Sequence, residues 1–152
     1  QKDSKLYLIC TGNKFSQGEE DKLSKLHIKN KTLQINASDK ELSELYTRAS
    51  LFVFPSLYEG FGIPILEAYA CHCPIAISNT SCFPEIAGDA AIYFDPYSVK
   101  DIANTIEAII YNPQKANELI QKGIKRLELY SWEKTVVETE ETYKKAIQGY
   151  NF

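Results

Sequence analysis

Two glutamates, Glu59 and Glu67, stand eight residues apart around a short segment that contains Gly60 and Gly62. Carboxylates accept hydrogen bonds from hydroxyl groups and can act as acids or bases, and glycine lets the backbone approach a ligand closely. The segment follows an apolar run, 51–54, and precedes apolar residues at helical spacing. These residue types therefore indicate a site for a polar ligand on a turn between a strand and a helix.

The turn itself suits a negatively charged ligand. The run 51–54 has the length and composition of a buried strand, and Pro64 is acceptable in the first turn of a helix. Backbone N–H groups at such a turn lie beside the positive end of the helix dipole, where proteins commonly hold phosphate. Glycine can also be present only to shape a tight turn. We expect a diphosphate to bind the amides of Gly60, Phe61, Gly62 and Ile63.

The sequence around the two glutamates, 56–68, reads SLYEGFGIPILEA. A second motif, PEIAGDAA, follows at 84–91, and matching residues occur at 38–49, 71–79 and 131–132. This pattern closely resembles the E-x7-E signature of the retaining glycosyltransferases of family 4, in the donor-binding half of the GT-B fold. Two glutamates at this spacing are common by themselves, but the two embedded motifs together are specific. The resemblance covers roughly residues 5 to 147.

The resemblance implies a role for several residues. Glu67 would accept hydrogen bonds from the ribose 2′,3′-diol, and Glu59 would contact hydroxyls of the transferred sugar near the reacting carbon. Ala37 would contact the base through its backbone. The simpler alternatives are an acidic residue favoured by the helix dipole for Glu67 and a solvated loop carboxylate for Glu59. Phe61 is interpreted as a packing residue that uses only its amide, Trp132 also as a packing residue, and Glu85 as structural.

The two carboxylates could also belong to a glycoside hydrolase. A retaining hydrolase needs its carboxyl groups about 5 Å apart across one bond. A few extended residues followed by one helical turn place the α-carbons of Glu59 and Glu67 on the order of 10 Å apart. That separation suits the two ends of a nucleotide sugar better, so we reject the hydrolase interpretation.

The resemblance implies transfer of a sugar from a nucleoside diphosphate with retention at the anomeric carbon. We expect UDP-hexose or UDP-N-acetylhexosamine as the donor, with GDP-mannose as the alternative. No metal or other cofactor is expected, and the leaving phosphate would take the proton of the acceptor. The acceptor would be a glycan or a lipid-linked saccharide in bacterial surface polysaccharide synthesis, such as that of lipopolysaccharide or O-antigen.

Two other classes of protein remain open. Some nucleotide-sugar epimerases share the GT-B architecture, and they would release an epimerised donor without any acceptor. A non-catalytic nucleotide-binding module would bind UDP, UDP-sugar or GDP and turn nothing over.

Length and motif coverage predict a single donor-binding domain over 1–152, with 132–148 as its terminal helix. An N-terminal acceptor-binding domain is the expected partner and would lie outside this sequence. In the resembling family, an arginine and a lysine that contact the diphosphate come from a segment expected before Gln1. The family also has a glycine before its base-binding turn, where this chain has Ile35-Asn36-Ala37.

The composition excludes several classes of protein. A net charge of −3 argues against a nucleic-acid partner, and no apolar run approaches the roughly 20 residues of a membrane span. Reduced cysteines predict a cytoplasmic protein, and the resemblance implies that it contacts the inner face of the membrane only peripherally, through the missing half. The four cysteines lack zinc spacing and are expected to be buried, reduced thiols, and His72 is expected at a helix C-terminus.

Strands that alternate with helices predict an α/β fold, a Rossmann-like parallel sheet with helices on both faces. Short apolar or alternating runs predict strands at 5–10, 32–35, 51–54, 74–78 and 91–94. Apolar residues at helical spacing and breaks at Pro113 and Ser131 predict helices at 19–29, 63–71, 99–111, 114–129 and 132–148. A further helix is predicted at 38–49, with Ser38 as its N-cap and Glu41 completing a capping box.

Overall fold

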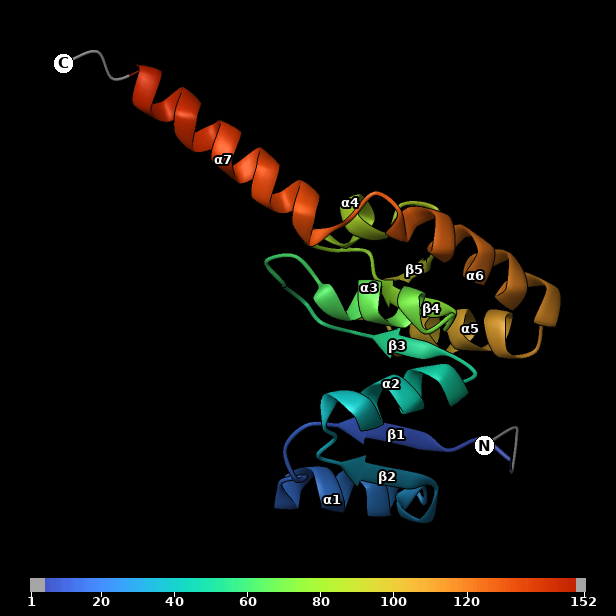
Figure 1. Cartoon of the computed structure of the whole chain (residues 1–152). Helices are drawn as coiled ribbons and strands as arrows, with labels where there is room; N and C mark the ends of the chain where they lie inside the picture. Colours follow the sequence, from blue (N-terminus) through green and yellow to red (C-terminus); the bar gives the residue numbers. More distant parts are fainter. Residues whose placement is uncertain (1–4, 150–152) are drawn as a thin grey trace. The chain divides into compact units, whose positions relative to one another are not determined.

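The computed structural model describes residues 5–149, and its elements divide between two compact units. The first unit extends to Leu45 and the second begins at Tyr46, so each is described by itself. Helix α2, Asp39–Arg48, spans the division. Figure 1 labels the elements in chain order.

Two short parallel strands form the sheet of the first unit. Strands β1, Leu8–Thr11, and β2, Thr32–Ile35, pair along their whole length. The connection between them contains helix α1, Gln17–Lys25, and the 3₁₀ turn η1, Lys29–Lys31. A parallel pair requires such a crossover because its strands run in the same direction.

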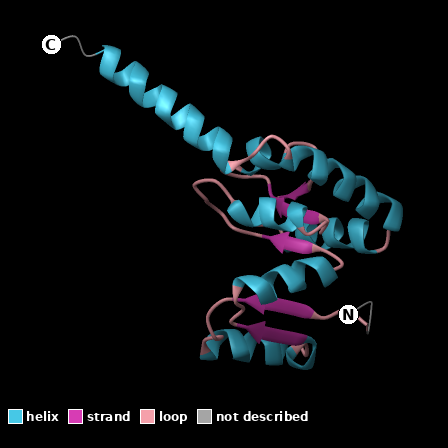
Figure 2. Ribbon diagram, in the orientation of Figure 1, coloured by secondary structure: helices cyan, strands magenta, loops and turns pink. Residues whose placement is uncertain are grey.

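Three parallel strands form the sheet of the second unit, in the order β3-β4-β5. Strand β4 is buried along its whole length, as expected of a central parallel strand. Figure 2 shows these strands together with the helices of the unit. The elements are β3, Phe52–Phe54; α3, Ile63–Ala70; β4, Ile75–Ser78; α4, Phe83–Ala87; β5, Ile92–Phe94; α5, Val99–Ile110; α6, Pro113–Leu127; and α7, Trp132–Gly149.

One part of the core of the second unit lies between its sheet and helices α5 and α6. Ala76 of β4 and Phe94 of β5 pack with Ile109 of α5 and Leu119 of α6 in one buried cluster. Helix α3 packs against α6, and α5 packs against both α6 and β5. The expected α/β class with parallel strands is therefore confirmed, although the strands are divided between two hydrogen-bonded sheets.

The ends of two helices show how local chemistry sets their lengths. The helix expected at 19–29 is α1, and it begins earlier, at Gln17, because Ser16 and Glu19 form a capping box. The hydrogen bond that the Ser16 hydroxyl donates to the carboxylate of Glu19 lowers the pKa of Glu19. The helix ends earlier because His27 adopts a positive φ of 55°. Ser38 and Glu41 make the same reciprocal bonds at the start of α2, as the sequence predicts.

His72 occupies the left-handed position that follows α3. Its φ is 56°, and its N–H donates to the carbonyl of Tyr69 at 3.0 Å. The N–H of Cys73 donates to Ala68 at 2.9 Å, so the two bonds form a Schellman motif, a turn that usually places glycine where His72 stands. The expected helix C-terminal position of His72 is confirmed.

Helix α7 differs from expectation because its large apolar side chains are exposed. We expected Trp132 to be a packing residue, yet it is 76% exposed, and Ile147 is 74% exposed. No described residue of α7 is buried. Within residues 5–149, no helix combines the length and apolarity that a membrane crossing requires.

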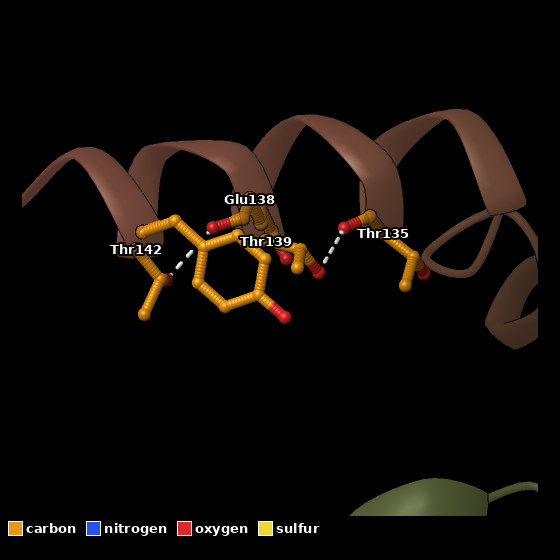
Figure 3. A pocket seen from close by; sticks show the side chains of 5 residues that line it. Thr135, Glu138, Thr139 and Thr142 are labelled. Atoms are coloured by element: carbon orange, nitrogen blue, oxygen red, sulfur yellow. Dashed lines mark hydrogen bonds between the residues drawn. The ribbon is translucent and has the colours of Figure 1, made fainter.

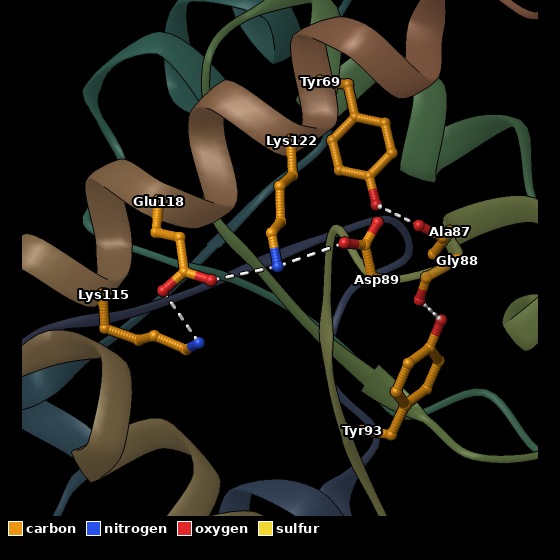
Figure 4. A network of polar contacts seen from close by, with 8 residues as sticks. All are labelled: Tyr69, Ala87, Gly88, Asp89, Tyr93, Lys115, Glu118 and Lys122. Carbon is orange, nitrogen blue, oxygen red and sulfur yellow. Dashed lines mark hydrogen bonds and ion pairs between the residues drawn. The ribbon is translucent and has the colours of Figure 1, made fainter.

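A polar network joins α6 to the loop after α4 (Figure 4). Lys122 pairs with Asp89 at 3.1 Å and with Glu118 at 3.0 Å. Its ammonium group lowers the pKa of both carboxyls. Their contribution to stability is therefore present above the ordinary carboxyl pKa and is lost as the pH falls through the lowered values. The side chains are exposed, so the contribution is small.

Gly123 of α6 lets this helix approach α3 closely. A Cβ atom at Gly123 would lie 2.4 Å from Cδ1 of Tyr69, a residue that is only 2% exposed. We expect Gly123→Ala to lower the free energy of unfolding by about 1–3 kcal/mol, because the ring must move within a packed core. Urea denaturation of the chain measures this change.

The matched control for this substitution is Gly149→Ala in α7, where nothing lies within 4 Å of the added atom. Its free energy of unfolding should change by less than about 0.5 kcal/mol. Equal stabilities for the two variants would contradict the close approach of α3 and α6.

Candidate functional site

The loop that carries Glu59 connects β3 to α3 at the carboxyl end of the second unit's sheet (Figure 1). In parallel α/β sheets, ligands commonly bind at this edge. The predicted order of strand, glycine turn and helix is confirmed.

Gly62 is the residue at which the chain turns into α3. It is the N-cap of the helix and has a φ of 97°, a region that side chains rarely adopt. It is buried, and a Cβ atom there would lie 3.1 Å from Cδ1 of Ile65 and 3.3 Å from the ring of Phe83. Gly60 has open space around it instead. Shape therefore requires glycine at the second position and not at the first.

The amide groups of the loop are available to a ligand. Gly62 is the N-cap of α3 but has no side chain that could accept hydrogen bonds from the first N–H groups of the helix. Pro64 has no N–H group. Within the described chain, no protein group accepts a hydrogen bond from the N–H of Gly60, Phe61, Gly62 or Ile63. Unpaired N–H groups at the positive end of a helix dipole bind anions, which fits the diphosphate predicted for this turn.

Glu59 is half-buried, and its carboxylate has a fixed partner. The hydroxyl of Ser56 donates to Oε1 of Glu59 at 3.0 Å and also contacts the carbonyl of Tyr58 at 3.2 Å. The second carboxylate oxygen remains available to a substrate hydroxyl. The sequence reasoning did not identify Ser56 as a partner of Glu59, although it stands three residues before it.

Glu67 is half-buried in the second turn of α3 and is contacted by Tyr46 of α2. The hydroxyl of Tyr46 donates to Oε2 of Glu67 at 3.3 Å. Burial, followed by the negative charge of Glu67, raises the pKa of Tyr46 above its ordinary value. Tyr46 therefore keeps its proton at neutral pH and acts as a donor that orients the carboxylate. Sequence reasoning missed this contact because 21 residues separate the pair.

Replacement of Tyr46 by Phe should weaken binding of the nucleotide donor predicted from the sequence by about two- to tenfold, the effect of losing one ordinary hydrogen bond. The ring and its edge-to-face contact with Phe52 would remain. The donor Kd of the complete enzyme measures this effect, and Tyr143→Phe on the exposed face of α7 is the control. A fall in kcat with an unchanged donor Kd would contradict an orienting role for Tyr46.

Phe61 packs against Tyr130, in the segment between α6 and α7, as expected. Its ring meets that of Tyr130 edge-to-face with centroids 5.8 Å apart, and Phe61 is 42% exposed. Tyr130 donates to the carbonyl of Ile86 at 3.2 Å, and Arg126 donates to the same carbonyl at 2.9 Å. Arg126 also donates to the carbonyl of Glu85, whose carboxylate is exposed. The loop is thereby tied to α4.

Ala37 lies in the first unit, between β2 and α2, whereas Glu59 and Glu67 lie in the second. Its contact with the base stays a prediction.

The expectation that all four cysteines are buried is correct only for Cys73, whose pKa is raised to about 12 by burial. It is wrong for Cys10, Cys71 and Cys82, which are half-buried.

Two shallow hollows occur away from this loop. One of about 250 Å³ lies along α7, where Thr139 and Thr142 bond to carbonyls of the same helix (Figure 3). One face of a single helix cannot enclose a ligand. The other, of about 300 Å³, is lined by Asp95, Ser98, Lys100, Asp101 and Asn104. The candidate site therefore rests on unpaired amides and oriented carboxylates and not on a closed cavity.

Comparison with known proteins places this geometry in a family. The family model described as "Glycosyl transferases group 1" matches residues 1–126. The "O-antigen chain mannosyltransferase B" of Escherichia coli is 38% identical over 106 residues, which make up 70% of this chain and 28% of that protein. The "O-antigen chain mannosyltransferase RfbU" of Salmonella typhimurium is 32% identical over 105 residues, covering 68% of this chain and 30% of that protein.

The fold is shared with solved structures. Sucrose-phosphate synthase from Thermosynechococcus elongatus superimposes with a TM-score of 0.82 over 93% of this chain and 39% of that chain, at 23% identity. Such structural neighbours are GT-B glycosyltransferases, which confirms the fold expected from the sequence. The chain spans less than a third of the length of the two relatives compared above.

Proposed function

Since the chain belongs to the glycosyl transferases of group 1, we propose that it is the donor-binding part of a retaining enzyme of glycosyltransferase family 4. The enzyme would transfer a sugar from a nucleoside diphosphate to a glycan or lipid-linked acceptor. The observation that carries this proposal is the row of unpaired amides, 60–63, between two oriented glutamates. The family match supports the class of reaction.

The proposed chemistry follows from what each group offers. The amides of the loop and the dipole of α3 neutralise the charge that develops on the leaving diphosphate. Glu67 accepts hydrogen bonds from the ribose hydroxyls, and Glu59 accepts them from the sugar beside its reacting carbon. The acceptor attacks on the face that the diphosphate leaves, and the leaving phosphate takes the acceptor's proton.

We propose a mannosyl donor ahead of the UDP-hexose expected from the sequence. The two relatives compared above are named O-antigen mannosyltransferases, which supports GDP-mannose as the donor and a surface polysaccharide as the product. Such synthesis would place the enzyme in the cytoplasm, at the inner face of the membrane. UDP-hexose and UDP-N-acetylhexosamine remain the competing donors.

The test uses the protein encoded by the complete gene, with labelled GDP-mannose, UDP-glucose and UDP-N-acetylglucosamine offered with lipid-linked saccharide acceptors. We expect label to pass from GDP-mannose to an acceptor, with the anomeric configuration of the donor kept in the product. Release of an epimerised donor without acceptor would identify an epimerase instead. Binding without turnover of any donor would identify a non-catalytic module.

We propose that the reaction needs no metal, because amides and a helix dipole carry the diphosphate charge and no Asp-x-Asp motif occurs in the sequence. The transfer rate should be unchanged by EDTA. A loss of activity that Mn²⁺ or Mg²⁺ restores would contradict this mechanism.

A further inference from the structure

Three consecutive residues after β4, Thr80, Ser81 and Cys82, bond to the backbone of the loop that carries Glu59. We propose that Ser81 is a positioning residue that fixes Glu59 for the reaction. The inference rests on the proposed function of Glu59 in sugar transfer. In this inference, the loop after β4 holds the glutamate in place.

The Ser81 hydroxyl bonds to Glu59 twice. It accepts a hydrogen bond from the N–H of Glu59 at 3.2 Å and donates one to the carbonyl of the same residue at 2.8 Å. A serine hydroxyl has one donor and two acceptor sites, so it can make both bonds together. These groups belong to the two peptide planes that flank the α-carbon of Glu59. Holding both planes fixes the direction in which its side chain leaves the backbone.

Ser81 holds Glu59 from an exposed position with an uncommon backbone conformation. Its φ is 58°, a left-handed conformation that is uncommon for residues other than glycine, and the residue is exposed. Burial therefore does not explain the side chain.

The two neighbours of Ser81 hold the same strip of backbone. Thr80 donates to the carbonyl of Leu57 at 3.2 Å. The thiol of Cys82 lies 3.0 Å from the carbonyl of Phe61 and 3.4 Å from that of Glu59. The segment 80–82 therefore engages carbonyls at alternate residues of the loop, while the amides at 60–63 are left for a ligand.

Adjacent strands of one sheet make this arrangement possible. Strands β3 and β4 pair in parallel, with Phe54 opposite Ile77. The loops that leave their carboxyl ends therefore start side by side, and the loop after β4 can hold the loop after β3. Ser56 fixes one carboxylate oxygen of Glu59 from within its own loop, so Ser81 fixes the backbone and Ser56 the side chain.

Two substitutions of Ser81 separate positioning from stability. Ser81→Ala and Ser81→Gly both remove the hydroxyl, but only glycine is relaxed at the left-handed backbone. The Gly variant should therefore melt at a higher temperature than the Ala variant. In the complete enzyme, both should lower kcat by about tenfold, because a displaced catalytic group loses its productive geometry. Donor Kd should change by less than about twofold in both, since the amides at 60–63 are retained.

The matched control is Ser24→Ala, which removes an exposed hydroxyl that bonds to the carbonyl of Glu20 in α1. Its kcat should equal that of the wild type. If kcat falls in Ser81→Ala but not in Ser81→Gly, the loss of activity follows the loss of stability and not the loss of the hydroxyl. That result would overturn the proposal. Unchanged kcat in both would overturn it as well.

A second measurement does not depend on any sugar transfer. Hydrogen exchange at the amide of Glu59, followed by NMR in the 152-residue chain, should speed up by about tenfold in both Ser81 variants, because the amide loses its acceptor. Unchanged exchange would show that Ser81 does not hold Glu59. If the complete enzyme transfers no sugar, the proposed function fails, and the exchange rates still decide whether Ser81 fixes the backbone of Glu59.

Discussion

Replacement of Glu59 by Gln in the complete enzyme should lower kcat by about 10²-fold, the scale of one misplaced catalytic contact. Glu59 is proposed to contact the sugar beside the carbon that becomes positively charged in the transition state. A neutral amide keeps the shape of the side chain and its bond from Ser56 but loses the negative charge. Donor affinity should change less, because the nucleotide is held elsewhere. Steady-state kinetics with a separate binding measurement checks both values.

Glu67→Gln is the matched comparison, because the same atoms are exchanged at the other end of the proposed donor. A ribose contact acts about equally in the ground state and the transition state, so its loss should raise the donor KM with little change in kcat. Donor Kd must be measured directly, since KM equals Kd only when chemistry is slow. A reversed pattern, with kcat lowered by Glu67→Gln and only donor binding weakened by Glu59→Gln, would reverse the two roles.

Replacement of Gly62 by Ala should weaken both the fold and the nucleotide site. The left-handed backbone and the nearby Ile65 and Phe83 leave no unstrained place for a Cβ atom. Strain of this kind costs about 1–3 kcal/mol, so the free energy of unfolding should fall by that amount. If the loop relaxes instead, its amides turn away from the ligand, and nucleotide affinity should fall by about tenfold or more.

Gly60→Ala provides the control for Gly62→Ala within the same loop. Gly60 has open space where the Cβ atom would be placed, and its backbone is not left-handed. Its free energy of unfolding should change by less than about 0.5 kcal/mol. Urea denaturation and titration with GDP or UDP measure both effects, and equal losses in the two variants would contradict the special role of Gly62.

The strand, turn and helix around Glu59 could be predicted because their signals are local. A short apolar run, two glycines and a helical repeat lie within 20 residues, at positions 51–70. The capping box of Ser38 and the C-terminal position of His72 were predicted for the same reason. Each depends on a few neighbouring residues.

The contacts from Tyr46 to Glu67 and from Ser81 to Glu59 could not be predicted, because they join distant parts of the sequence. Tyr46 lies 21 residues from Glu67, and Ser81 lies 22 residues from Glu59. Serine and tyrosine carry no periodic signal, and the left-handed φ of Ser81 has no local sequence mark. The exposure of Trp132 was also missed, because an aromatic residue in an amphipathic helix normally indicates burial.

The central claim is that the amides at 60–63 bind the diphosphate of a nucleotide sugar. The most direct test is an NMR titration of the ¹⁵N-labelled 152-residue chain with GDP and with UDP. The proposed site predicts saturable shifts that are largest at the amides of Gly60, Phe61, Gly62 and Ile63 and that are weakened in the Gly62→Ala variant. Saturable shifts centred instead on the hollow at Asp95–Asn104, or no shift at 60–63 with either nucleotide, would contradict it.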